Sequence, residues 1–231
     1  MKASIAPHFF VFNPKSYLCG QTLMDLVNEA DQLVDEDVTI FVTGPYVDLK
    51  EMAEQSKNII VTAQHLDGIY PGRGMGAVLP ESLRKAGVGA TFLNHAEHPM
   101  TLSELVKALE VCRALELISI VCADSVEEAK AIAVLNPDII LCEPTSLIGT
   151  GQTSGEAYIR ETNEAIKSIN PNVLVMQAAG ISNATDVYQT ILAGADGTGC
   201  TSGIVKAPSP QHMLVDMVSA VRTAIADKEV Q

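Results

Sequence analysis

The feature that most constrains the fold is a series of short apolar segments, rich in β-branched residues, that recurs along the whole chain. These segments are nearly continuously apolar rather than alternating, as expected for strands buried on both faces of a parallel sheet. Their spacing predicts eight strands, at residues 9–12, 38–42, 59–63, 90–93, 117–121, 139–142, 173–176 and, more weakly, 197–199.

The segments between these predicted strands have helical periodicity. Residues 102–109, for example, place apolar side chains at intervals of three and four. Two helix starts carry the residues of a capping box, Thr101 with Glu104 and Ser125 with Glu128. A final helix is expected over about residues 211–226, just after Pro210.

Eight strand–helix units in one uninterrupted chain predict a (β/α)8 barrel. Neither a low-complexity linker nor a shift in composition divides residues 1–231, so we expect a single domain. An open doubly wound sheet is the structural alternative, but it normally has a glycine-rich turn after its first strand. Here that turn begins with Asn13, Pro14 and Lys15, and we therefore favour the barrel.

Composition excludes several classes of function. The 28 acidic residues outnumber the 15 Lys and Arg, giving a net charge of −13, which argues against nucleic-acid or anionic-membrane partners. Neither a signal peptide nor an apolar run long enough for a membrane helix is recognisable. The five widely spaced cysteines indicate free thiols in a reducing cytoplasm, and the histidine spacing predicts no metal site.

Functional residues of a (β/α)8 barrel come from the carboxyl ends of its strands. The polar residues and glycines at the predicted strand ends therefore form the candidate site. Any one of them has an ordinary structural explanation, whereas their joint placement indicates function. They are Asn13, Lys15, Gln64, His65, Asn94, His95, Glu97, Glu143, Gly180, Ser182, Thr201, Ser202 and Gly203.

Glu143 follows the sixth apolar segment directly. A carboxylate there is partly desolvated, which raises its pKa toward that of a useful general base. The next loop has Pro144 at its start and Gly149 and Gly151 at its end, a composition that suits a hinged lid. A merely irregular connection is the alternative.

Two glycine-containing turns, residues 178–182 and 200–203, follow the seventh and eighth segments. Barrels often build a phosphate site at these positions from backbone N–H groups. Neither turn contains an arginine, so amides, serine hydroxyls and Lys15 would hold the anion. Glycine also occurs in such turns for steric reasons alone.

The sequence resembles the triosephosphate isomerase family, and especially its short archaeal-type branch. The resemblance covers nearly the whole chain in order. It is carried by the segments at residues 13–15, 63–67, 78–81, 93–97, 143–144, 148–151, 179–182 and 202–207.

The resemblance implies that Glu143 is the base and that neutral His95 polarises the substrate carbonyl. Lys15, with Asn13 beside it, would stabilise the negative charge of the enediolate. No metal or organic cofactor is implied. The phosphate would be bound by main-chain and hydroxyl groups of Ile148, Gly149, Gly180, Thr201 and Ser202.

Several positions depart from the family's pattern. Ala96 replaces a serine that holds the base, and His98 and Pro99 stand where an arginine is usual. Met75 replaces a threonine that reaches a neighbouring subunit's site. Ala178 replaces a glycine, and Pro14 separates Asn13 from Lys15. These changes leave Lys15, His95 and Glu143 in place but alter their surroundings.

Our first hypothesis is therefore a cytoplasmic isomerase of glycolysis and gluconeogenesis that interconverts glyceraldehyde 3-phosphate and dihydroxyacetone phosphate through an enediolate. One alternative is isomerisation of a four-carbon phosphorylated ketose of the erythrulose phosphate type. Another is a sugar-phosphate-binding barrel with weak or lost catalysis. The resemblance also implies a homodimer or homotetramer formed through the Met75 loop, although Met75 could equally fold back onto its own barrel.

Overall fold

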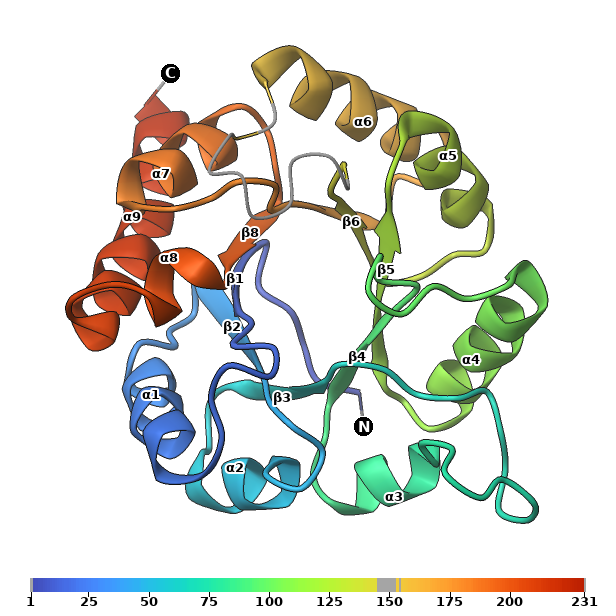
Figure 1. Ribbon diagram of the computed structural model, residues 1–231. Helices are drawn as coiled ribbons and strands as arrows, with labels where there is room; N and C mark the ends of the chain where they lie inside the picture. Colours follow the sequence, from blue (N-terminus) through green and yellow to red (C-terminus); the bar gives the residue numbers. More distant parts are fainter. Residues whose placement is uncertain (1, 145–152, 154, 231) are drawn as a thin grey trace.

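The computed structural model describes residues 2–144, 153 and 155–230, and it forms a closed barrel of eight parallel strands (Figure 1). β1 pairs with both β2 and β8, with Phe10 opposite Ile40 on one side and Thr198 on the other, so the sheet has no free edge. This closure excludes the open doubly wound sheet. The strands are β1 (His8–Phe12), β2 (Val38–Thr43), β3 (Ile60–Ala63), β4 (Ala90–Leu93), β5 (Ile118–Ala123), β6 (Ile139–Cys142), β7 (Leu174–Gln177) and β8 (Gly197–Cys200).

The helices form a ring outside the barrel (Figure 1). They are α1 (Gly20–Gln32), α2 (Leu49–Gln55), α3 (Pro80–Lys85), α4 (Leu102–Ala114), α5 (Val126–Val134), α6 (Glu156–Ile169), α7 (Ala184–Leu192), α8 (Ser202–Val205) and α9 (Pro210–Val230). The α9 helix extends four residues beyond the predicted end at 226. Within the described ranges, none of these helices is both long and apolar enough to cross a membrane.

The two predicted capping boxes have different outcomes. At α4, the Thr101 hydroxyl accepts from the Glu104 N–H and the Glu104 carboxylate accepts from the Thr101 N–H, so the box is confirmed. At α5, the Ser125 hydroxyl accepts from the Glu128 N–H as predicted. The Glu128 carboxylate, however, accepts from the Asp124 N–H at 2.7 Å. The predicted hydrogen bond from the Ser125 N–H to the Glu128 carboxylate is therefore wrong, because the N–H that donates belongs to the preceding residue, Asp124.

Apolar side chains fill both the barrel interior and the layer between strands and helices. In the interior, the rings of Phe9 and Phe41 meet edge to face with centroids 5.6 Å apart. Gly197 packs against Phe9 so closely that an added Cβ would lie 2.4 Å from the ring. The large Phe9 side chain thus explains why β8 is glycine-rich and gives a weak strand signal. Four of the five free cysteines are buried, and Cys19 is exposed.

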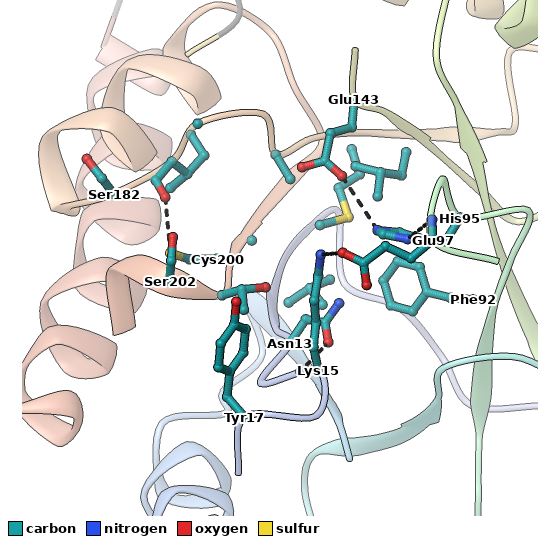
Figure 2. Close-up of a pocket in the computed structure, with 18 residues that line it drawn as sticks. Asn13, Lys15, Tyr17, Phe92, His95, Glu97, Glu143, Ser182, Cys200 and Ser202 are labelled. Carbon is teal, nitrogen blue, oxygen red and sulfur yellow. Dashed lines mark hydrogen bonds and ion pairs between the residues drawn. The ribbon is translucent and has the colours of Figure 1, made fainter. Parts of the chain in front are cut away.

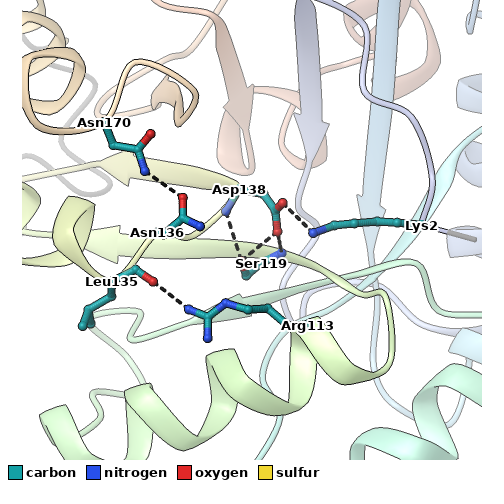
Figure 3. A network of polar contacts seen from close by, with 7 residues as sticks. All are labelled: Lys2, Arg113, Ser119, Leu135, Asn136, Asp138 and Asn170. Carbon is teal, nitrogen blue, oxygen red and sulfur yellow. Dashed lines mark hydrogen bonds and ion pairs between the residues drawn. The ribbon is translucent and has the colours of Figure 1, made fainter.

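A polar network lies at the amino-terminal ends of β5 and β6 (Figure 3). One Asp138 carboxylate oxygen accepts both the N–H and the hydroxyl of Ser119, at 2.8 and 2.9 Å. The other oxygen forms an ion pair with Lys2. Since Ser119 is the second residue of β5 and Asp138 immediately precedes β6, these bonds fix the two strands relative to each other. Their role is to hold the barrel in register.

Candidate active site

A cavity of about 180 Å³ lies at the carboxyl ends of the strands (Figure 2). It is lined by residues that follow β1, β4, β6, β7 and β8, the ends at which barrel enzymes place their functional groups. Among the strand-end candidates, Gln64, His65, Asn94 and Gly203 do not line it, whereas Glu97 and Ser182 do. Every described residue to which the family resemblance assigns a role also lines it. These residues are Asn13, Lys15, His95, Glu143, Gly180, Thr201 and Ser202. The predicted residues Ile148 and Gly149 lie outside the described residues.

The backbone at Lys15 is left-handed, with φ of 49°, a conformation that costs energy for a residue other than glycine. Three hydrogen bonds hold it. The Lys15 N–H donates to the Asn13 side-chain oxygen at 2.9 Å, and the Thr43 hydroxyl donates to the same oxygen at 2.6 Å. The Gln64 amide donates to the Lys15 carbonyl at 2.8 Å. This arrangement aims the Lys15 side chain into the cavity.

The Lys15 ammonium forms an ion pair with the Glu97 carboxylate, with 2.6 Å between Nζ and Oε1 (Figure 2). The hydrogen bond from Lys15 lowers the pKa of Glu97, and the weaker effect of burial opposes this shift. The Lys15 side chain is 20% exposed and that of Glu97 is 62% exposed. The sequence identified Glu97 as a candidate at a strand end but gave it no role. The structure shows that its carboxylate orients the Lys15 ammonium.

His95 follows β4 through Asn94, whose backbone is also left-handed, with φ of 57°. The Asn94 side chain donates to the Cys122 carbonyl at 3.1 Å and accepts from the Met100 N–H at 3.0 Å. Both bonds fix the base of the loop that carries the imidazole. An amide side chain thus spans from β5 to the start of α4 and sets the point from which His95 projects.

The surroundings of His95 favour a neutral ring with the proton on one particular nitrogen. Burial, and secondarily the positive charge of Lys15, lower the pKa of His95, while the Glu97 carboxylate opposes this shift. The Glu97 backbone N–H donates to His95 Nδ1 at 3.1 Å. Because Nδ1 accepts, the single ring proton resides on Nε2. Nε2 lies 3.9 Å from Glu143 Oε2, so the imidazole presents its N–H on the side of the carboxylate.

Glu143 immediately follows β6, and its backbone N–H donates to the Ala123 carbonyl at 3.0 Å. Its side chain is only 16% exposed. Burial raises the pKa of Glu143, as the sequence predicted, and the Lys15 charge partly opposes this shift. A carboxylate that binds a proton more readily than usual, beside a neutral N–H donor and an ammonium, can remove a proton from a carbon next to a carbonyl.

The opposite side of the cavity is formed by backbone and hydroxyl groups. Gly180 is left-handed, with φ of 70°, and Thr201 and Ser202 form the turn into α8. Gly203 lets the two turns approach, because an added Cβ would lie 2.6 Å from the Ser182 carbonyl oxygen. Among the described lining residues, the only lysine or arginine is Lys15.

Among the positions that depart from the family pattern, Ala178 lines this cavity and the others do not. Ala96 is exposed, and Ala178 lines the cavity beside the glycine turn. The ring of His98 packs on His65 with centroids 3.9 Å apart. Met75 is fully exposed, so the alternative in which it folds back onto its own barrel is wrong.

A closed barrel with a carboxylate, a neutral imidazole and an ammonium at its carboxyl ends defines the chain as an enzyme of the (β/α)8-barrel class. A family model described as triosephosphate isomerase matches residues 8–221. The chain belongs to the triosephosphate isomerase family, and it is therefore an aldose–ketose isomerase.

Curated relatives agree with this assignment. The chain is 36% identical to the triosephosphate isomerase of Methanobacterium bryantii over 217 residues, covering 91% of this chain and 96% of the relative. It is 35% identical to that of Methanocaldococcus jannaschii, covering 91% and 99%. It is 34% identical to that of Sulfolobus acidocaldarius, covering 92% and 94%. These archaeal relatives confirm the predicted archaeal-type branch.

Proposed function

We propose that the chain interconverts glyceraldehyde 3-phosphate and dihydroxyacetone phosphate through an enediolate, with Glu143, His95 and Lys15 as the catalytic residues. One observation carries the assignment of roles. The protonated Nε2 of a neutral imidazole faces the carboxylate of a buried glutamate at 3.9 Å, with an ammonium in the same cavity.

The chemistry follows from these protonation states. The Glu143 carboxylate removes a proton from the carbon next to the substrate carbonyl, while His95 Nε2–H donates a hydrogen bond to the carbonyl oxygen. Lys15 stabilises the negative charge that forms on the enediolate oxygens. The hydroxyl proton of the enediolate passes from one oxygen to the other through the His95 Nε2–H, and Glu143 returns the carbon-derived proton to the neighbouring carbon. Aldehyde and ketone are thereby exchanged without any net oxidation. A neutral imidazole suits this role because its proton is shared with, rather than lost to, the oxygen.

The phosphate is bound at the other side of the cavity. Gly180, Thr201 and Ser202 supply N–H and hydroxyl groups there, and Lys15 supplies positive charge. Ile148 and Gly149, which lie outside the described residues, complete this set as predictions from the family resemblance. The same applies to the lid over residues 144–151, which would exclude water around the enediolate.

The two other functions are less well supported. The relatives at 34–36% identity described above are triosephosphate isomerases, which disfavours a four-carbon substrate. A binding protein without catalysis would have no need for a buried base beside a neutral imidazole. Nothing in the arrangement of Lys15, His95 and Glu143 indicates lost activity.

An isotope experiment tests the proposal. The purified protein is given glyceraldehyde 3-phosphate in deuterated water, and dihydroxyacetone phosphate is examined for carbon-bound deuterium. Rapid turnover with deuterium incorporation is expected. Higher activity on erythrulose phosphate would select the four-carbon alternative. Absence of turnover, with phosphate compounds still raising the melting temperature, would select the binding protein.

We further propose that the chain forms a homodimer or homotetramer through the loop that carries Met75. The full exposure of this apolar side chain supports the proposal, and Tyr46, Val47 and Tyr70 are also exposed. Light scattering of the wild type and of Met75→Glu tests it, since a charge at the contact should shift the distribution toward monomer. A monomeric wild type would contradict it. A cytoplasmic location and a place in glycolysis and gluconeogenesis follow from the family.

A further inference from the structure

A stacked pair of histidines lies beside the active site and has no role in the chemistry proposed above. His65 follows β3 and His98 follows β4. Their ring centroids are 3.9 Å apart and their planes are inclined by 38°. The His65 side chain is buried, whereas His98 covers it from the solvent side and is exposed. The contact therefore joins an exposed loop to a fixed interior group.

His98 ends the tight turn that His95 begins. The His98 N–H donates to the His95 carbonyl at 2.7 Å, and the two residues form an antiparallel bridge. Within this turn, the Glu97 N–H fixes the His95 tautomer and the Glu97 carboxylate orients Lys15. The turn at residues 95–98 thus orients both the His95 imidazole and the Lys15 ammonium. Any rotation of the turn would disturb both.

His65 is a rigid platform for the His98 ring. The Tyr46 hydroxyl donates to the His65 carbonyl at 3.1 Å. His65 Nε2 lies 3.5 Å from an Asp67 carboxylate oxygen, and the other oxygen of Asp67 accepts from the Val78 N–H at 2.6 Å. Asp67 thereby ties the platform to both ends of the loop between β3 and α3.

We propose that His98 is a positioning residue for His95: stacking on buried His65 fixes the turn at residues 95–98 and so holds the His95 N–H in its catalytic direction. The kinetic part of this inference rests on the proposed isomerase function. The structural part concerns only the tautomer and orientation of His95, and it can be measured without catalysis.

The stack also responds to pH. Burial, followed by the proximity of His98, lowers the pKa of His65, while the Asp67 and Glu104 carboxylates oppose this shift. A positive charge on His65 is disfavoured in this buried position beside His98, so protonation of His65 on acidification should weaken the stack and loosen the turn. The other titratable and charged groups that line the cavities on either side of the pair are Lys15, Tyr46, His95, Glu97 and Lys107.

Kinetics of variants at residue 98 test the proposal. His98→Ala removes the ring, and we expect kcat to fall roughly tenfold, within the loss that small misplacement of a catalytic group causes. KM should stay within about twofold because no phosphate contact changes. His98→Phe keeps a ring that can stack on His65, so it should restore kcat. His212→Ala, which removes an exposed histidine on α9, is the matched control.

Nitrogen NMR of histidine-labelled protein gives the second readout. In the wild type and in His98→Phe, His95 should show an unprotonated Nδ1 and a protonated Nε2. In His98→Ala the two nitrogen shifts should move toward a tautomer average. If His98→Ala fails to fold, His98→Gln removes the ring with less loss of volume and carries the same expectations.

Wild-type kcat together with an unchanged His95 tautomer in the ring-deleted variant would overturn the proposal. Equal losses in His98→Ala and His98→Phe would also overturn it, because stacking would then not be the cause. If the wild type itself shows no isomerase activity, the proposed function fails, and the tautomer measurement still decides the role of His98.

Discussion

Glu143→Asp is the substitution that most directly tests the geometry of the base. It keeps the carboxylate and removes one methylene, which draws the charge back along the side chain by up to about 1.5 Å. In the wild type the Glu143 Oε2 atom lies 3.9 Å from His95 Nε2, close enough for a substrate to contact both groups at once. After the change, the carboxylate should lie too far from a substrate held by His95 and by the proposed phosphate site.

The expected loss follows from this displacement. A misplacement of about 1 Å costs roughly 10²-fold in rate, so a shift of up to about 1.5 Å should lower kcat by about 10²- to 10³-fold. KM should change little, because the residues proposed to bind the substrate phosphate lie on the opposite side of the cavity from Glu143. Glu143→Gln, which removes the base without shortening the side chain, should reduce kcat further.

The measurement combines initial rates with deuterium exchange from solvent. Glu110→Asp, the same substitution at an exposed position on α4, should behave as the wild type. If Glu143→Asp retained kcat within about twofold, proton transfer would not depend on the position of this carboxylate, and the assignment of Glu143 as base would be wrong.

Three further predictions concern binding and stability. Lys15→Met should weaken phosphate-ester binding by about 2 kcal/mol, or roughly thirtyfold in Kd, and unchanged affinity by calorimetry would refute the role of Lys15. Acidification should destabilise the fold, because the pKa values of His8, His65 and His95 lie below their ordinary value of 6.5. Below about pH 6.5 the unfolded chain therefore binds more protons than the folded chain, and the free energy of unfolding should fall as the pH drops. The limiting slope is about 1.4 kcal/mol per pH unit for each proton. A melting temperature independent of pH between about 6.5 and 5 would contradict this. Thr101→Ala removes the α4 cap and should lower the free energy of unfolding by about 1 kcal/mol in urea denaturation. Ser103→Ala, two residues further along and outside the cap, should lower it by less.

The fold could be predicted because its signal is local and repeated. Each strand is a short apolar run, and seven of the eight strands stand out in the sequence without knowledge of the others. β8 is the exception, because backbone and side-chain atoms of β1 and β7 leave no room for a Cβ at Gly197 and Gly199. An added Cβ at Gly199 would lie 2.5 Å from the Val11 carbonyl oxygen and 2.8 Å from Met176. β8 could be predicted from its position as the eighth strand in the series of strand–helix units, but not from its composition.

The candidate site could be predicted only as a set of residues at strand ends. The Lys15–Glu97 ion pair joins residues 82 apart, and the His65–His98 stack joins two separate loops. Neither contact has a local sequence pattern, because each depends on the side-chain conformations that the closed barrel imposes. The Ser125 box shows the same limit at short range. The Glu128 carboxylate accepts from the Asp124 N–H, an alternative that the motif does not distinguish.

The net charge of −13 and the anionic substrate can be reconciled at the level of the cavity. Lys15 already has a carboxylate partner in Glu97, and Glu143 adds a second negative charge, so side-chain charge alone would not attract a phosphate. Backbone N–H groups bind anions without any net charge on the protein. Binding at the turns of Gly180 and Ser202 would therefore add to the single positive charge of Lys15, which also responds to the charge that forms on the enediolate. On this view the exposed Glu97 carboxylate holds the ammonium ready for the transition state, and the acidity of the surface has no bearing on the ligand.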